Sequence, residues 1–181
     1  RQSGGGPVLI NLIHDIDLMR FLYGDIASLQ AMTSNAIRGH EVEDTAVLMM
    51  RFVNGALGTV TVSDTTVSPW NYDLSARETD RFPQQDINSH FFSGTHGSLT
   101  LPKLEVWSYK DQRHWEKPIS VMRCEPMRAS PYEAQLNNFL GVIAGKEKPV
   151  CSALDGLRAL EAALAVRESA ASGRAVQLTS S

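Results

Sequence analysis

The sequence is poor in the features that mark several large classes of protein. It has only two cysteines, with no CxxC pair and no histidine pair at ligand spacing, so neither a zinc site nor a disulfide framework is indicated. No apolar run reaches the ~18–20 residues that a membrane span needs. The formal net charge is −3, whereas a face that binds nucleic acid needs an excess of basic residues.

A dinucleotide-binding pattern is missing as well. The chain contains no GxGxxG motif and no repeated alternation of strand and helix. Its first residues, Arg1-Gln2-Ser3, include neither an initiating Met nor the apolar core of a signal peptide, so we expect a piece of a longer protein. The unpaired cysteines favour a reducing compartment, and we expect a cytoplasmic protein that binds neither nucleic acid nor membrane.

What is present is typical of one globular domain over residues 1–181, with 43% hydrophobic and 20% charged residues. After the flexible cluster Gly4-Gly5-Gly6-Pro7, apolar residues recur at helical spacing over residues 8–23. Asn54-Gly55 lies between two strand-like stretches, 45–53 and 56–65, and predicts a β-hairpin with a type I′ turn. Other strands are predicted at 26–34, 90–95, 98–101, 104–109, 119–124 and 175–178.

Two helices are predicted in the last third of the chain. Ser130-Pro131 begins the first, whose buried stripe is expected to be Leu136, Phe139, Leu140 and Ile143. Ser152 and Asp155 begin the second, whose apolar side is expected to carry Leu157, Leu160, Leu164 and Val166. Strands grouped apart from helices indicate an α+β fold, a mainly antiparallel open sheet with helices packed on one face.

The first helix carries a polar cluster on an otherwise apolar element, namely Asn11, His14, Asp15 and Asp17. On a helix, Asn11 and His14 share a face, as do His14 and Asp17. An imidazole titrates near neutral pH and can move a substrate proton in either direction. The alternative interpretation is a structural histidine beside solvated aspartates. A metal site is disfavoured because the cluster holds a single histidine.

The irregular segment 68–88 offers a second group of polar and aromatic residues. Trp70, Asn71 and Arg77 are candidates for a polar ligand site, because aromatic rings stack on sugar faces and polar side chains bind hydroxyls. The alternative is that Trp70 and Tyr72 only fix this loop to the domain. Both interpretations stay open on the sequence.

Several segments together resemble the C-terminal domain of the glucose–fructose oxidoreductase / inositol dehydrogenase / MocA family. They are GGGPVLINLIHDIDLMRFLYGDI, EDTAVLMMRFVNGALGTVTVSDT, FFSGTHGSLTL and SPYEAQLNNFLGVIAGKEKPVCSALDGLRALEAALAVRESAASGRAVQL, and they cover nearly the whole chain. The resemblance implies an N-terminal Rossmann domain that binds NAD or NADP, absent from this chain. It also implies hydride transfer at a hydroxyl of a sugar, cyclitol or related compound, and homodimers or homotetramers formed through the sheet.

Some of the family's site residues have a counterpart in this sequence and others do not. His14 matches the histidine that acts on the hydroxyl proton. The aspartate four residues earlier in the family falls on Ile10, so Asn11 is the nearest polar substitute and Asp15 and Asp17 are candidate substrate-binding residues. The lysine of the family's Glu-Lys-Pro motif belongs to the N-terminal domain, so its role is not transferred to Lys117 or Lys148.

Two functions from different classes follow. The first is a sugar or polyol dehydrogenase whose isolated C-terminal piece is inactive and binds no cofactor. The second is a non-catalytic ligand-binding or oligomerisation module derived from that family, which the replacement at Ile10 favours.

Overall fold

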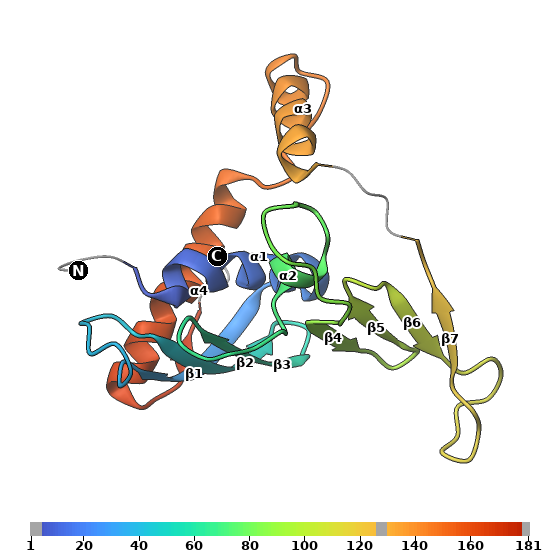
Figure 1. Ribbon diagram of the computed structural model, residues 1–181, viewed down its shortest axis with the longest axis horizontal. Coiled ribbons are helices and arrows are strands. Elements are labelled where there is room, and N and C mark those ends of the chain that lie inside the picture. Colours follow the sequence, from blue (N-terminus) through green and yellow to red (C-terminus); the bar gives the residue numbers. More distant parts are fainter. Residues whose placement is uncertain (1–4, 126–129, 179–181) are drawn as a thin grey trace. The chain divides into compact units, whose positions relative to one another are not determined.

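The computed structural model describes residues 5–125 and 130–178 (Figure 1). Gly4 of the predicted glycine cluster and Arg1-Gln2-Ser3 lie outside the described residues. Contacts along the chain divide it into two compact units, one within residues 1–66 and 150–181 and the other within residues 67–149. Each unit has its own four-stranded antiparallel sheet.

The first unit is a sheet in the order β3-β2-β1-β8 with helices on one face. Its elements are η1 (Val8–Leu12), α1 (Ile13–Tyr23), β1 (Ile26–Ser34), β2 (Thr45–Phe52), β3 (Leu57–Ser63), α4 (Ala153–Ser172) and β8 (Val176–Gln177). Their order and type agree with the sequence prediction, except that residues 8–12 form a π-helical turn instead of a regular α-helix.

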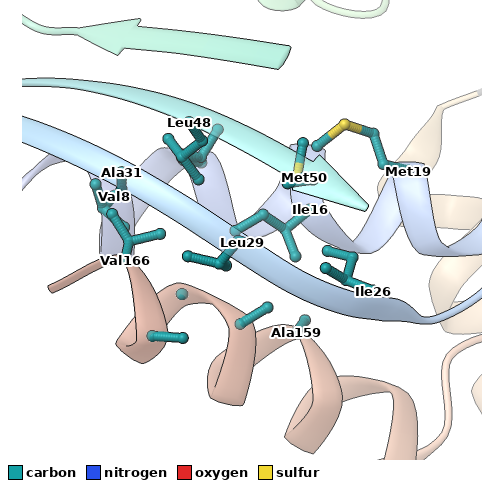
Figure 2. Packing of buried hydrophobic residues seen from close by; sticks show 14 of the residues in the cluster. Val8, Ile16, Met19, Ile26, Leu29, Ala31, Leu48, Met50, Ala159 and Val166 are labelled. Carbon is teal, nitrogen blue, oxygen red and sulfur yellow. The ribbon is translucent and has the colours of Figure 1, made fainter. Parts of the chain in front are cut away.

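Alternation in the central strands decides which face is buried. In β2 every second residue from Ala46 to Phe52 is buried, and the residues between them are exposed or half-buried. In β1 a register shift between Ile26 and Ser28 lets both Ile26 and Leu29 face the core, although they are three residues apart. Figure 2 shows the resulting cluster of side chains from η1, α1, β1, β2 and α4.

Helix α4 packs through its small residues, not through its leucines. Its buried side is Ala159, Ala162, Ala163, Ala165, Val166 and Ser169, and α4 packs against β1 and α1. The Ser169 hydroxyl accepts the Ala31 N–H (2.9 Å) and donates to the Arg174 carbonyl (2.6 Å), so strand and helix approach closely. Of the residues expected on its apolar side, Val166 is buried, whereas Leu157, Leu160 and Leu164 are exposed, because only short side chains fit this approach.

The hairpin between β2 and β3 forms where the sequence predicted it, but its turn is of another type. A type I′ turn needs positive φ at both central residues, and Asn54 is not among the described residues with positive φ. Instead the Gly55 N–H donates to the Phe52 carbonyl and the Phe52 N–H to the Ala56 carbonyl, both at 2.9 Å. Within the loop 53–55, only Gly55 has positive φ (88°), as in a three-residue loop with a glycine bulge.

The second unit is a sheet in the order β4-β5-β6-β7, with a short helix before it and a longer one after it. Its elements are α2 (Tyr72–Ser75), β4 (His90–Ser93), β5 (Ser98–Leu101), β6 (Glu105–Ser108), β7 (Ser120–Arg123) and α3 (Pro131–Ile143). Ser130 caps α3 by accepting the Glu133 N–H, and Pro131 occupies the first turn, as predicted.

The predicted buried stripe of α3 is wrong. Leu136, Phe139, Leu140 and Ile143 lie on one side of the helix, yet all four are exposed and no residue of α3 is buried. Helical spacing indicates which residues share a side, but burial also needs a surface opposite that side.

The predicted α+β class is confirmed, with antiparallel pairing throughout and helices on one face of the first sheet. The strands form two sheets of four instead of one continuous sheet. That residues 1–181 act as one domain stays a prediction.

Candidate functional site

The helix that carries His14 is held by a row of buried apolar residues. Val8, Leu12, Ile16 and Met19 recur at helical spacing and are buried in the core. His14 and Asn11 point away from this row and are both exposed. The Ile13 N–H donates to the Val8 carbonyl five residues earlier, so the helix begins with a wide turn just before His14.

The Glu43 side chain caps the N-terminus of this helix. The Val8 N–H donates to Glu43 Oε1 (3.1 Å), across 35 positions of sequence. A Cβ on Gly6 would overlap the Glu43 carboxylate. This position therefore needs glycine because Glu43 packs directly against its backbone, and not because of its dihedral angles. Because a carboxylate already occupies the N-terminus of the helix, the glycine cluster does not fit the phosphates of a dinucleotide.

The carboxylate of Asp17 belongs to a network around Arg20. The Arg20 side chain is only 9% exposed, and its Nη1 lies 3.5 Å from Asp17 Oδ1. Its Nε and Nη2 donate to Asp25 Oδ1 at 3.0 and 2.7 Å, and Nη1 donates to the Asp155 carbonyl at 2.9 Å. Arg20 thus joins α1 to the start of β1 and to the first turn of α4, and Asp17 is a partner in that junction.

A shallow hollow lies over this junction. It measures about 100 Å³ and is lined by Asp17, Arg20, Phe21, Val150, Cys151 and Asp155. Burial, followed by the carboxylates of Asp17 and Asp155, raises the pKa of the Cys151 thiol, while Arg20 opposes this shift. A raised pKa keeps the thiol protonated and less nucleophilic, and the hollow is smaller than the roughly 300 Å³ typical of a ligand pocket.

In the segment 68–88, Tyr72 acts as an anchor. Its hydroxyl donates to Glu78 Oε1 (2.9 Å) and its ring meets the His90 ring edge-on at 5.8 Å. Burial and the bond to Glu78 raise the pKa of Tyr72 to about 12, so the phenol stays neutral. The interpretation that Tyr72 fixes the loop to the domain is therefore supported.

The three residues predicted to bind ligand in this segment differ in their surroundings. Trp70 is exposed, whereas the Asn71 side chain caps α2 by accepting the Leu74 N–H at 3.3 Å. Arg77 has a positive φ of 59° and its Nη2 lies 3.8 Å from Asp86 Oδ1. A ligand would have to compete with these contacts at Asn71 and Arg77.

The predicted site residues therefore fall into two groups. Asn11, His14, Asp15 and Asp17 lie on one helix of the first unit, and Asp15 is half-buried. Trp70, Asn71 and Arg77 lie in the second unit, so a shared site stays a prediction. Sequence reasoning missed Glu43 and Arg20, because no local pattern links either of them to partners 35 and 135 positions away.

Among residues 5–125 and 130–178, no three His, Cys, Asp or Glu side chains are grouped so that they could hold a metal ion. None of the helices in that part of the chain is long and apolar enough to cross a membrane.

Comparison with known proteins identifies the fold and the family. Residues 1–100 match the sequence model of the GFO/IDH/MocA C-terminal domain. The chain belongs to this family. The match to a C-terminal domain agrees with the α+β fold of the described residues.

Named GFO/IDH/MocA relatives act on sugar derivatives. The chain is 27% identical to 1,5-anhydro-D-fructose reductase from Ensifer adhaerens, over 98% of this chain and 49% of the relative. It is 25% identical to D-apiose dehydrogenase from Rhizobium rhizogenes, over 92% of this chain and 47% of the relative. The chain thus spans about half the length of these relatives.

A solved structure shows the same fold. Levoglucosan dehydrogenase, in complex with NADH and L-sorbose, superposes with a TM-score of 0.71 at 22% identity. The match covers 98% of this chain and 51% of that protein. At this identity the likeness establishes the fold alone.

Proposed function

We propose that this chain is the substrate-facing domain of an NAD- or NADP-dependent dehydrogenase that acts on a hydroxyl of a sugar, cyclitol or related compound. The observation that carries the proposal is the exposed pair Asn11 and His14 on a helix whose opposite side is fully anchored. The names of the relatives, a reductase of anhydrofructose and a dehydrogenase of apiose, support a sugar-like substrate.

In this proposal His14 moves the hydroxyl proton. During oxidation the imidazole accepts that proton, and the same group returns it during reduction. Asn11 orients the hydroxyl by hydrogen bonds but cannot take its proton, since an amide has no acid–base role at neutral pH. By the resemblance, the exposed Ile10 takes the position of the family's aspartate, so Asp15 or Asp17 would orient the imidazole instead. Of these two, Asp17 already pairs with Arg20.

The nicotinamide would accept or supply the hydride at the carbon that bears the hydroxyl. We propose that the cofactor is held in the part of the longer protein that corresponds to the other half of the relatives. The N-terminus of the His14 helix cannot serve as a phosphate site, because Glu43 occupies it. This chain alone is accordingly expected to bind neither NAD nor NADP.

We also propose a homodimer or homotetramer formed through the open face of the first sheet. Cross-strand pairing places Met49 beside Gln30 and Thr59, and Val47 beside Met32 and Thr61. Met32, Val47 and Met49 are exposed large apolar side chains on the face away from the helices. The exposed, unpaired cysteines agree with a cytoplasmic location.

The role of His14 is tested in the longer protein with a panel of sugars and polyols, by following nicotinamide absorbance. His14→Ala should lower kcat/KM by about 10²–10⁴-fold, because the proton acceptor is lost. His96→Ala, an exposed histidine of the second unit, is the control and should leave turnover unchanged. A near-normal rate in the His14 variant removes it from the mechanism.

The proposed oligomeric state is tested by measuring the molar mass of the assembly by light scattering after gel filtration. Met49→Asp places a charge in the centre of the open face and should shift the protein to a smaller assembly. A wild-type protein that is already monomeric at micromolar concentration would contradict the proposal.

The second candidate function is a binding or assembly module without catalysis. The apolar Ile10 in place of the family aspartate favours it. A longer protein that binds cofactor but turns over no member of the panel would support the module instead of the dehydrogenase.

A further inference from the structure

Few side chains in the first turns of the His14 helix face outward. Within residues 5–20, the exposed residues are Ile10, Asn11 and His14, and every other residue is buried or half-buried. The Ile10 side chain is 58% exposed. The outward surroundings that this helix gives to the His14 imidazole therefore consist of one amide and one aliphatic side chain.

Ile10 lies one turn before His14 on the same side of the helix. Residues three and four apart in a helix have Cβ atoms about 5–6 Å from each other. The Ile13 N–H donates to the Val8 carbonyl, so the turn before His14 holds more residues than a regular α-helical turn. Because each residue of a wider turn rotates by less than about 100°, the residue four positions before His14 comes into line with it. Ile10 is therefore in line with the imidazole, and Asn11 lies beside it.

The acidic residues of this helix are less exposed than Ile10. Asp15 and Asp17 are half-buried, and Asp17 Oδ1 lies 3.5 Å from Arg20 Nη1. A substrate whose hydroxyl reaches His14 from outside the helix thus meets the aliphatic side chain of Ile10.

An aliphatic side chain beside a reacting hydroxyl selects for the substituent on the next carbon. That carbon is one bond away from the carbon that bears the hydroxyl, within the reach of a side chain four residues from His14. A second hydroxyl placed against Ile10 would lose its hydrogen bonds to water without replacement, which costs free energy. A methylene group in the same place would gain free energy from burial.

We propose that Ile10 is a specificity-determining residue, and that the substrate is a deoxy or anhydro sugar or cyclitol. In such a compound, the carbon next to the reacting one carries hydrogen in place of a hydroxyl. The inference rests on the proposed function, and it names the class of substrate for the same site. It gives Ile10 a role that is compatible with catalysis, since His14 still moves the proton.

The test is a selectivity ratio measured in the longer protein. D-glucose, D-galactose and myo-inositol are each compared with their monodeoxy derivatives, including 1,5-anhydro-D-glucitol, in which carbon 1 of glucose has lost its hydroxyl. The ratio is kcat/KM for the derivative divided by kcat/KM for its parent. Both values come from the same protein sample, so the ratio does not depend on the fraction of a variant that is folded.

Three variants are compared with the wild type. Ile10→Asn offers hydrogen bonds without adding a charge, and Ile10→Val keeps the side chain aliphatic. Ile37→Asn is the matched control, because Ile37 is 74% exposed and lies outside the His14 helix.

The wild type should prefer at least one derivative over its parent by about 10–10²-fold, which is what an added hydroxyl costs in an apolar site. Ile10→Asn should lower that ratio by about tenfold, because the asparagine amide can bond to the parent's hydroxyl. Ile10→Val and Ile37→Asn should keep the wild-type ratio.

Two results would overturn the inference. The first is a wild type that turns over each parent as well as or better than its derivatives. The second is a ratio that is the same in Ile10→Asn as in the wild type, which is expected if another part of the protein covers Ile10.

Failure of the dehydrogenase proposal is distinguishable. Where no compound is turned over, dissociation constants for the same pairs, measured by calorimetry with NADH present, replace kcat/KM in the ratio. A preference for a derivative that Ile10→Asn abolishes would then support the inference without catalysis. Equal dissociation constants within each pair, or no binding of any compound, would overturn it.

Discussion

At the residue scale, contacts between distant parts of the chain explain why particular small residues occur. Gly6 lies against Glu43, which in turn accepts the Val8 N–H at the start of the His14 helix. Gly156 in α4 has open space beside its backbone instead, since a Cβ there would meet no atom within 4 Å. The two glycines look alike in the sequence and should respond to substitution in opposite directions.

Gly6→Ala should destabilise the protein by about 1–3 kcal/mol, because the added methyl group displaces the Glu43 side chain and its backbone. Gly156→Ala should stabilise it by about 0.4–1 kcal/mol, because alanine loses less conformational entropy in a helix. Urea unfolding of the two variants measures both values. Equal effects would show that Glu43 does not fill the space beside Gly6.

At the element scale, Asp44 organises the connection between β1 and β2. It is buried, and its Oδ2 accepts the N–H groups of Ile37 (3.0 Å) and Arg38 (3.1 Å). Burial opposes its ionisation, but these bonds and the Thr45 hydroxyl outweigh it and hold the pKa of Asp44 below its ordinary value. The connection is therefore stabilised by the ionised form.

The pH dependence of stability follows from the direction of this shift. A carboxyl whose pKa is lowered by folding stabilises the protein above its unfolded-state pKa, and this contribution is lost as the pH falls through the folded-state pKa. Asp44→Asn should lower Tm at pH 7, and the difference from wild type should shrink as the pH falls below about 4. A difference in Tm that is the same at every pH would mean that shape, and not charge, is what Asp44 supplies.

The residues that start a helix do not determine which side of that helix is buried. The capping box of Ser152 and Asp155 starts α4 where the sequence predicted, and Ser130 starts α3. The sides that these helices bury were not predictable from the same patterns. The alanines of α4 lie on the side that packs against β1, where the Ser169 hydroxyl accepts the Ala31 N–H across 138 positions of sequence.

At the scale of the whole molecule, the two units differ in how much apolar surface they bury. All sixteen buried apolar residues of the described chain lie in the first unit, in the cluster that contains Leu29 and Leu48. Among the described residues of the second unit, the buried ones are Ser75 and Thr100. Burial of apolar surface is the main source of folding free energy, so the first unit should be the more stable part.

Leu48→Ala should therefore lower the free energy of unfolding of the first unit by about 2–5 kcal/mol. Leu57→Ala is the matched control, since Leu57 lies on the neighbouring strand but is exposed, and it should change stability by less than about 0.5 kcal/mol. Hydrogen exchange, followed separately for β1–β3 and β4–β7 at low protein concentration, measures the effect on each unit. Equal destabilisation of the two sheets would mean that they unfold together.

The sequence by itself determined the order and type of most elements, the α+β class and the caps of α3 and α4. It missed the π-helical turn at residues 8–12 and the short helix α2. The features that it determined depend on local spacing and on residues that begin or end an element within a few positions. It also predicted the hairpin at Asn54-Gly55, although not the three-residue loop that forms there.

Only the tertiary structure decided which helix side is buried, that the strands form two sheets, and that Glu43 and Arg20 hold the His14 helix in place. Each of these depends on groups far apart in the chain, such as Val8 with Glu43 or Arg20 with Asp155. Local periodicity says which residues share a side, but the free energy of burial and pairing depends on what lies opposite.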